Sequence, residues 1–242
     1  MADQSKFNGQ PEEHVFAGFL FDLDGTLINT TEAITKHWQK IASELHTDPD
    51  ALIVASRGRR SIDTMALYDP SKARWDYINT LESQIPPLYG TTASRTPGAL
   101  SLLHSLLTHS APWAIITSCT RALLTAWCVK FSLPAPDATV TAEDVGLGKP
   151  EPECYLLGRE RIGVPAGDAG GKKVLVVEDS PSGVLAGKRA GCVVLGLATT
   201  HAVETVRGAG ADWVVEDLKC LRVVGREEGG WRVCIERSFV EG

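Results

Sequence analysis

Apolar runs without alternation mark the most buried segments of this chain. The first extends from Val15 to Leu27 and is interrupted near its end by two acids and a glycine. Shorter runs of the same kind lie at Trp113 to Ile116 and at Val174 to Val177. Runs of this type fit strands that are covered on both faces of a parallel sheet.

A different periodicity fills the segment between the first two runs. Residues from about Thr31 to Leu45 place apolar side chains at helical spacing, and further helix-like pieces follow to about Pro86. From about Thr96 onward, strand and helix patterns alternate, which predicts right-handed βαβ units and a parallel sheet. The helical block is therefore expected to be an insertion after the first strand.

Local signals predict where several elements begin and turn. Asn29 and Glu32 are disposed as a capping box for the first helix. Thr96 before Pro97, and Ser180 before Pro181, each fit an N-cap followed by proline at the first helical position. Two partly alternating runs around a Glu-Gly-Gly turn, within residues 222–237, predict a terminal hairpin.

Asp22 and Asp24 lie where the first apolar run ends. Ligands bind at the carboxyl ends of strands in open α/β sheets, so these acids are placed to form a site. One acid can stay ionised beside a metal as a nucleophile while the other exchanges a proton. Asp-Gly is also a common turn pair, but acids and a lysine recur at later strand ends and favour a site.

The segment Asp22-Leu-Asp-Gly-Thr-Leu27 resembles the first motif of the haloacid dehalogenase superfamily of phosphohydrolases. The residues that match the later motifs follow in the family's order: Ser118 or Thr117, then Lys149 in Gly148-Lys-Pro-Glu-Pro152, then Glu178 and Asp179. Segments such as Arg57-Gly-Arg-Arg-Ser61 and Ala186-Gly-Lys-Arg-Ala-Gly-Cys192 further resemble the fungal phosphatases of glycerol phosphate and 2-deoxyglucose 6-phosphate, and this similarity extends from about residue 15 to about residue 222.

This resemblance implies an α/β fold, a Rossmann-like parallel-sheet core with a helical cap inserted after the first strand and a short C-terminal β-hairpin. The expected core comprises residues 14–29 and 96–222, the cap residues 30–95, and the hairpin extension residues 223–242. Trp38 and Trp75 are expected in the core of the cap.

The resemblance also implies the chemistry. Asp22 would attack phosphorus and form an aspartyl phosphate, and Asp24 would act as general acid and then general base. Mg²⁺ would be held by the carboxylates of Asp22 and Asp179, by the main-chain carbonyl of Asp24, and by Glu178 directly or through water.

Phosphate and substrate contacts are expected from both domains. Ser118 and Lys149 would stabilise the phosphoryl group, with Gly25, Thr26 and Cys119 beside it. Cys119 stands where a smaller residue is expected. In the cap, Arg60 is the expected specificity residue and Glu82 a weaker candidate, while Arg57 replaces a histidine that is usual in similar phosphatases.

Several alternatives remain at this stage. Ser118 could instead cap the helix that begins near Thr120, and Lys149 could be a surface lysine beside a turn. A phosphosugar mutase shares every core motif, and a phosphatase of a specialised-metabolite ester or a non-catalytic binding protein could use the same fold. A dehalogenase fits less well because it needs neither Asp24 nor a metal.

Composition and charge limit which partners and which compartment are expected for this protein. The 242 residues carry a formal net charge of −6, with lysine and arginine mostly scattered, which disfavours a nucleic-acid partner. The six cysteines form no C-x-x-C pair, the polar N-terminus has no apolar signal core, and no stretch is long enough to span a bilayer. A monomeric cytoplasmic enzyme that acts on a small phosphorylated metabolite, with no membrane partner, is expected.

Overall fold

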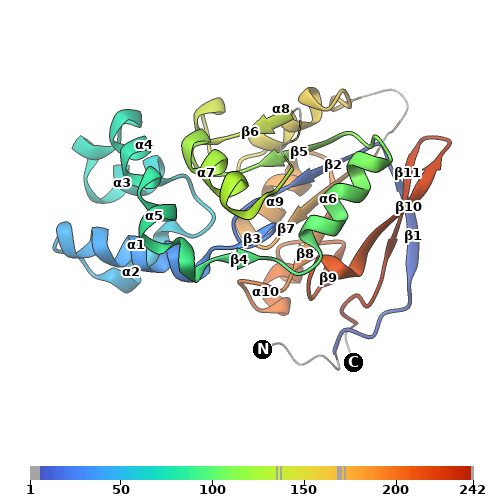
Figure 1. Ribbon diagram of the computed structural model, residues 1–242, viewed down its shortest axis with the longest axis horizontal. Coiled ribbons are helices and arrows are strands. Elements are labelled where there is room, and N and C mark those ends of the chain that lie inside the picture. The colour runs from blue at the N-terminus through green and yellow to red at the C-terminus, as the bar shows by residue number, and fades with distance from the viewer. Residues whose placement is uncertain (1–5, 135, 137, 168–170, 172, 241–242) are drawn as a thin grey trace.

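The computed structural model describes residues 6–134, 136, 138–167, 171 and 173–240. A six-stranded parallel sheet occupies the centre of the molecule, with strand order β6-β5-β2-β7-β8-β9 (Figure 1). Its strands are β2 (Gly18–Phe21), β5 (Trp113–Ile116), β6 (Ala138–Val140), β7 (Val174–Glu178), β8 (Val193–Leu197) and β9 (Trp213–Val215). The strand earliest in sequence is therefore central, and the chain winds outward from it in both directions. This order creates a switch point at the carboxyl end of β2, where ligands bind in such sheets.

Helices cover both faces of this sheet. Successive residues of a strand point to opposite sides, so each face of the sheet presents apolar side chains that a layer of helices buries. Phe19 and Phe21 belong to one apolar cluster together with residues of α6 (Ala99–Thr108) and α7 (Arg121–Phe131). Leu20 belongs to the cluster on the other face, which includes residues of α8 (Glu153–Arg161), α9 (Pro181–Arg189) and α10 (Val203–Gly208). The predicted α/β class is confirmed.

The first apolar run is divided between two sheets, unlike the single strand that the pattern predicts. Residues of β1 (Glu12–Phe16) pair antiparallel with β11 (Gly230–Ile235), which also pairs with β10 (Leu221–Glu227). At Ala17 the chain passes into the parallel sheet, where its amide donates to the Lys173 carbonyl over 2.8 Å. The apolar pattern cannot show this break, because both sheets bury the run. The predicted terminal hairpin is confirmed, with Glu227 opposite Gly230.

The segment between Asn29 and Ser94 forms the helical cap at one end of the molecule (Figure 1). It contains α1 (Thr31–Glu44), α2 (Pro49–Ser56), α3 (Ser61–Tyr68), α4 (Trp75–Ser83) and α5 (Ile85–Tyr89), and a short β3 (Ile28–Asn29) pairs with β4 (Ser94–Arg95) at its base. Its own apolar cluster contains buried Trp38, and Trp75 is partly buried against this cluster.

The first cap helix begins at Thr31 as predicted, but two of the three predicted N-terminal caps are wrong. Thr30 is the N-cap of α1 and makes no side-chain cap bond, so Asn29 and Glu32 form no capping box. Gly98, in a left-handed conformation, precedes α6, and the Thr96 hydroxyl is buried without a partner in the part of the chain described. Ser180 does cap α9, since its side chain accepts from the Gly183 amide with Pro181 at the first position.

The six cysteines are free in the structure. Within the described ranges, no helix combines the length and the apolar character needed to cross a membrane.

Candidate active site

A cavity lies between the carboxyl ends of the parallel strands and the cap. It encloses about 970 Å³ of space, open solvent at its mouth included. Its core wall comes from the loops after β2, β5, β7 and β8, together with Lys149. Its cap wall comes from helices α1, α2, α4 and α5 and from the loop between α2 and α3. All the strand-end acids singled out from the sequence except Glu178, together with Ser118, therefore share one cavity with cap residues.

Lys149 joins two of the acids at the base of this cavity. Its Nζ donates to Asp22 Oδ1 over 2.6 Å and to Glu178 Oε1 over 2.7 Å, and the lysine is only 5% exposed. Burial alone would lower the pKa of Lys149, but the charges of Asp22 and Glu178 outweigh burial and raise that pKa well above its usual range. The lysine is therefore a fixed positive charge, and the reading of Lys149 as a surface residue is excluded.

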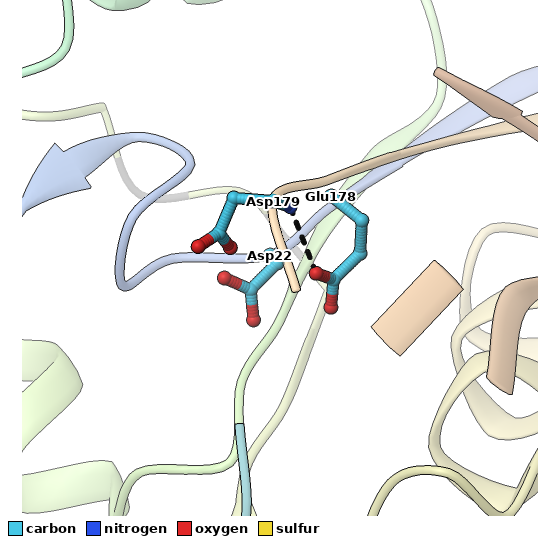
Figure 2. Close-up of side chains that lie close together, drawn as sticks. All are labelled: Asp22, Glu178 and Asp179. Carbon is cyan, nitrogen blue, oxygen red and sulfur yellow. Dashed lines mark hydrogen bonds between the residues drawn. The ribbon is translucent and has the colours of Figure 1, made fainter. Parts of the chain in front are cut away.

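Asp22 lies immediately after β2, where its amide donates to the Val177 carbonyl over 3.0 Å. Its side chain is buried, and burial raises the pKa of Asp22, an effect that the Lys149 ammonium opposes. One carboxylate oxygen each from Asp22, Glu178 and Asp179 lie within 4.8 Å of one another (Figure 2).

Three buried carboxylates share one lysine in this cluster, so negative charge is left uncompensated. Burial, together with the charge of Glu178, raises the pKa of Asp179 to about 7, while hydrogen bonds from Thr200 and Thr26 oppose the shift. A bound cation would favour the ionised forms. Oxygen donors with excess negative charge fit a hard divalent ion such as Mg²⁺.

Glu178 differs from the other two acids because its oxygens are already heavily used. Oε1 accepts from Lys149 and, over 3.0 Å, from the Tyr155 hydroxyl. Oε2 accepts from the amides of Asp179 and Ser180, each over 2.9 Å, and from the Ser180 hydroxyl over 3.0 Å. These contacts fix the loop after β7 and favour the water-mediated form of the metal contact expected for Glu178.

Asp24 lies at the cavity, and its Oδ1 accepts from the Thr30 hydroxyl over 2.8 Å. Burial raises the pKa of Asp24, and that hydrogen bond partly offsets the rise.

Gly25, the residue after Asp24, has a φ of 90°, and a Cβ at this position would lie 2.2 Å from Asp179 Oδ2. Glycine is therefore required both for the backbone conformation and for the approach of Asp179.

The sequence led us to expect the Thr26 hydroxyl beside the phosphoryl group, but Thr26 does not line the cavity. Its hydroxyl is fully buried and donates to Asp179 Oδ1 over 3.2 Å. It orients the acid from behind instead of reaching a substrate.

The loop after β5 separates the roles of Thr117, Ser118 and Cys119. The Thr117 hydroxyl donates to Cys119 Sγ over 3.1 Å and accepts from the Cys119 amide over 3.1 Å. Among the described residues, the Ser118 hydroxyl makes a single, long hydrogen bond of 3.4 Å, to the Gly58 carbonyl at the cavity. Thr120, not Ser118, caps α7. Ser118 is therefore the hydroxyl available to a ligand, whereas the buried Cys119 thiol, whose pKa burial raises, forms part of the wall.

Arg60 is turned away from the cavity, which differs from the expectation that it reads the substrate. Nε and Nη2 donate to the two oxygens of Asp63, each over 2.7 Å. The remaining donors reach three carbonyls of the core: Val145 at 2.6 Å, Gly146 at 2.9 Å and Ala142 at 3.4 Å. All five guanidinium N–H groups are thus used, and the residue fastens the cap to the segment before Lys149.

Glu82 makes a second tie between cap and core. Its Oε1 accepts from the Ser61 hydroxyl over 2.5 Å, and its Oε2 accepts from the Thr120 amide at the start of α7 over 2.7 Å. Burial raises the pKa of Glu82 to about 7, although both hydrogen bonds oppose the shift. Because both oxygens are used, Glu82 holds the loop after β5 against the cap more than it offers an acceptor to a ligand.

Sequence reasoning missed several residues of the site. Thr200, after β8, donates a short hydrogen bond to Asp179 Oδ2, and His201 beside it also lines the cavity. The end of the apolar run Val193–Leu197 could have pointed to them by the same strand-end rule that located Asp22. Tyr155 gave no such signal, because its hydroxyl reaches Glu178 from the interior of a helix.

Comparisons with known proteins agree with this geometry. The sequence model of the haloacid dehalogenase-like hydrolases matches residues 19–197. Glycerol-1-phosphate phosphohydrolase 2 of Saccharomyces cerevisiae is 38% identical over 85% of this chain and 84% of its own length. Hexitol phosphatase A of Escherichia coli is 34% identical over 88% of this chain and 96% of its own. A hydrolase from Pseudomonas syringae shares the fold, with a TM-score of 0.70, 24% identity, and coverage of 84% of this chain and 94% of its own.

The chain belongs to the haloacid dehalogenase-like hydrolase family.

Proposed function

We propose that this protein is a Mg²⁺-dependent phosphatase that hydrolyses a small polyol or sugar phosphate through an aspartyl phosphate. The observation that carries this proposal is the meeting of Asp22, Asp24, Ser118 and Lys149 at one cavity, beside the carboxylates of Glu178 and Asp179. The polyol or sugar class is supported by the names of the relatives, which act on glycerol 1-phosphate and on hexitol phosphates.

The first half-reaction uses both acids of the loop after β2. An oxygen of Asp22 attacks phosphorus, the phosphorus–oxygen bond of the ester breaks, and Asp24 gives its proton to the leaving alkoxide. The raised pKa of Asp24 favours the protonated form that this step needs. In the second half, Asp24 takes a proton from water, water oxygen bonds to phosphorus, and inorganic phosphate leaves Asp22.

Ser118 and Lys149 act on the phosphoryl group in both steps. Ser118 donates a hydrogen bond to a phosphoryl oxygen, and the Lys149 ammonium offsets the negative charge that gathers there. Cys119 and the backbone of Gly25 form the adjoining wall. Glu178 holds Lys149 in place through the 2.7 Å contact.

Mg²⁺ fits the acidic cluster, where Asp22, Asp179 and the Asp24 carbonyl would hold it and Glu178 would contact it through water. When bound, the ion would offset the negative charge of the carboxylates and of the phosphoryl group. Residues 14–29 and 96–222 are the proposed core domain, residues 30–95 the proposed cap, and residues 223–242 the proposed extension, of which 241 and 242 lie outside the described part. We also propose a cytoplasmic monomer without nucleic-acid or membrane partners.

A substrate panel tests this function. Purified protein is assayed for phosphate release from glycerol, hexitol and deoxyhexose phosphates and from p-nitrophenyl phosphate, with Mg²⁺ and with EDTA. We expect Mg²⁺-dependent release, highest for a polyol or sugar ester. Phosphorus NMR of the products separates hydrolysis from a mutase, which would return the phosphoryl group to another hydroxyl. The relatives are named for hydrolysis, which favours free phosphate.

A further inference from the structure

The loop between α2 and α3 presents two arginines, Arg57 and Arg59, to the cavity. Both side chains are exposed and both residues line the cavity, on either side of Gly58. Neither guanidinium has a hydrogen bond or an ion pair within the described ranges of the chain. Arg60, the next residue, shows the contrast, because every one of its donors is used.

The backbone that carries these two arginines is held against the core. The Gly58 carbonyl accepts from the Ser118 hydroxyl over 3.4 Å and from the Ser182 hydroxyl over 3.5 Å. Gly58 has a φ of 68°, and a Cβ there would lie 2.4 Å from Ser182 Oγ. Arg60 fixes the other end of the loop. The loop therefore sits directly beside Ser118, where the transferred phosphoryl group is proposed to bind.

The charges of Arg57 and Arg59 are not needed to hold that phosphoryl group. Lys149 and Ser118 already serve it from the core, and the acidic cluster fits a cation next to it. The charge of Arg57 also reaches His201 across the cavity, where it adds to burial in lowering the pKa of that histidine. Two guanidinium groups without a partner among the described residues thus border the same cavity as Ser118.

We propose that Arg57 and Arg59 form a second anion subsite, which selects phosphate monoesters whose organic part carries another anionic group, a carboxylate or a second phosphate. This inference rests on the proposed phosphatase function. A guanidinium offers paired, charge-assisted donors to either anion. A neutral hydroxyl would leave most donors of the guanidinium, and its positive charge, without a partner.

Matched substrates test the subsite. Glycerol 3-phosphate and 3-phosphoglycerate share a three-carbon skeleton and differ at the far end, a neutral alcohol in one and a carboxylate in the other. Fructose 6-phosphate and fructose 1,6-bisphosphate form the corresponding pair for a second phosphate. We expect the wild type to have the higher kcat/KM for the acidic member of at least one pair, and the pair that responds identifies the anion.

Arg57→Gln and Arg59→Gln should each reduce kcat/KM for the acidic substrate by about tenfold or more, and for its neutral partner by less than about threefold. Arg74→Gln is the matched control, since Arg74 is an exposed cap arginine that does not line the cavity, and it should change neither value. Equal losses on both members of a pair would show that the arginines only attract phosphate esters in general, and would overturn the subsite. A wild-type preference for the neutral members would overturn it too.

Binding separates this proposal from the function on which it rests. Calorimetry on an Asp22→Asn background gives the ratio of Kd values for 3-phosphoglycerate and glycerol 3-phosphate without turnover, and the same measurement covers the fructose pair. If the wild type releases no phosphate from any ester, the phosphatase function fails. The subsite still stands if one ratio favours the acidic ligand and is lost with Arg57→Gln or Arg59→Gln, and it fails if neither ratio depends on these arginines.

Discussion

On the core wall of the cavity each charged side chain has a partner, whereas on the cap wall Arg57 and Arg59 have none in the described part of the chain. Asp22 faces Lys149 at 2.6 Å, and Asp24 accepts from Thr30 at 2.8 Å. Paired charges hold a fixed geometry for one reaction. Arg57 and Arg59 lie exposed at the cavity. Under the two proposals above, the core wall carries the reaction and these two arginines on the cap wall select the substrate.

The largest effect is expected from Asp22→Asn, because this substitution removes the proposed nucleophile and keeps the size and shape of the side chain. We expect kcat to fall by roughly 10⁴-fold or more for every ester, acidic or neutral, with circular dichroism unchanged. In the variant, Lys149 keeps its 2.7 Å contact with Glu178, so the buried ammonium still has an anionic partner. Appreciable phosphate release by the folded variant would refute the covalent mechanism.

Asp179→Ala should have the next largest effect, on the metal instead of on the nucleophile. We expect the Mg²⁺ concentration for half-maximal activity to rise by more than about tenfold, because one proposed carboxylate ligand is lost. EDTA should abolish the phosphatase activity of the wild type. Glu204→Ala removes an exposed acid that does not line the cavity and should leave the Mg²⁺ titration unchanged. Activity that survives exhaustive chelation would remove the metal from the mechanism.

Arg60→Ala tests whether the paired arginine of the loop between α2 and α3, which does not line the cavity, has a structural role. The variant loses the bidentate contact to Asp63 and the contacts to core carbonyls, so we expect a loss of about 2 to 4 kcal/mol in the free energy of unfolding. Rates should fall by the same factor for a preferred ester and for p-nitrophenyl phosphate. A selective loss on the preferred ester, with stability unchanged, would restore Arg60 as a specificity residue. Arg74→Ala, at an exposed pair, should have a smaller effect on stability.

The same contrast explains what the sequence could predict. In a parallel sheet all strands end at one edge, so the polar residues after β2, β5 and β7 had to meet whatever their contacts. The sequence therefore predicted that Asp22, Ser118 and Asp179 gather there, and the structure brings them together. Their individual roles stay predictions.

Cap contacts were not predictable in this way, because they depend on how the cap docks. Nothing in Arg57-Gly-Arg-Arg-Ser61 shows that Arg60 turns into the core while its two neighbours face the cavity. Local signals also failed where tertiary contacts compete with them. Thr96 looks like an N-cap, yet α6 begins only after Gly98, whose left-handed turn lies against the backbone of Leu218 and Lys219.

The smallest effect concerns His37, a titratable side chain on the cap wall. It is 3% exposed, its Nε2 has no hydrogen-bond partner in the described part of the chain, and its ring packs edge-on against Trp38. Burial, followed by the charge of Lys40, lowers the pKa of His37 to about 4. The histidine is therefore neutral in the folded protein at pH values where the unfolded chain already binds a proton.

The sign of the effect follows from that depressed pKa. Above about pH 6.5 both states are neutral and His37 adds no pH dependence. As the pH falls from about 6.5 towards 4, the unfolded state takes up the proton first, so His37 favours unfolding by about 2 kcal/mol at pH 5. His37→Phe and His37→Gln should both remove this share of the pH dependence, although they differ in packing. Denaturant unfolding at pH 7 and pH 5 measures it. If both variants lose as much stability as the wild type between these pH values, His37 is not held neutral by the cap.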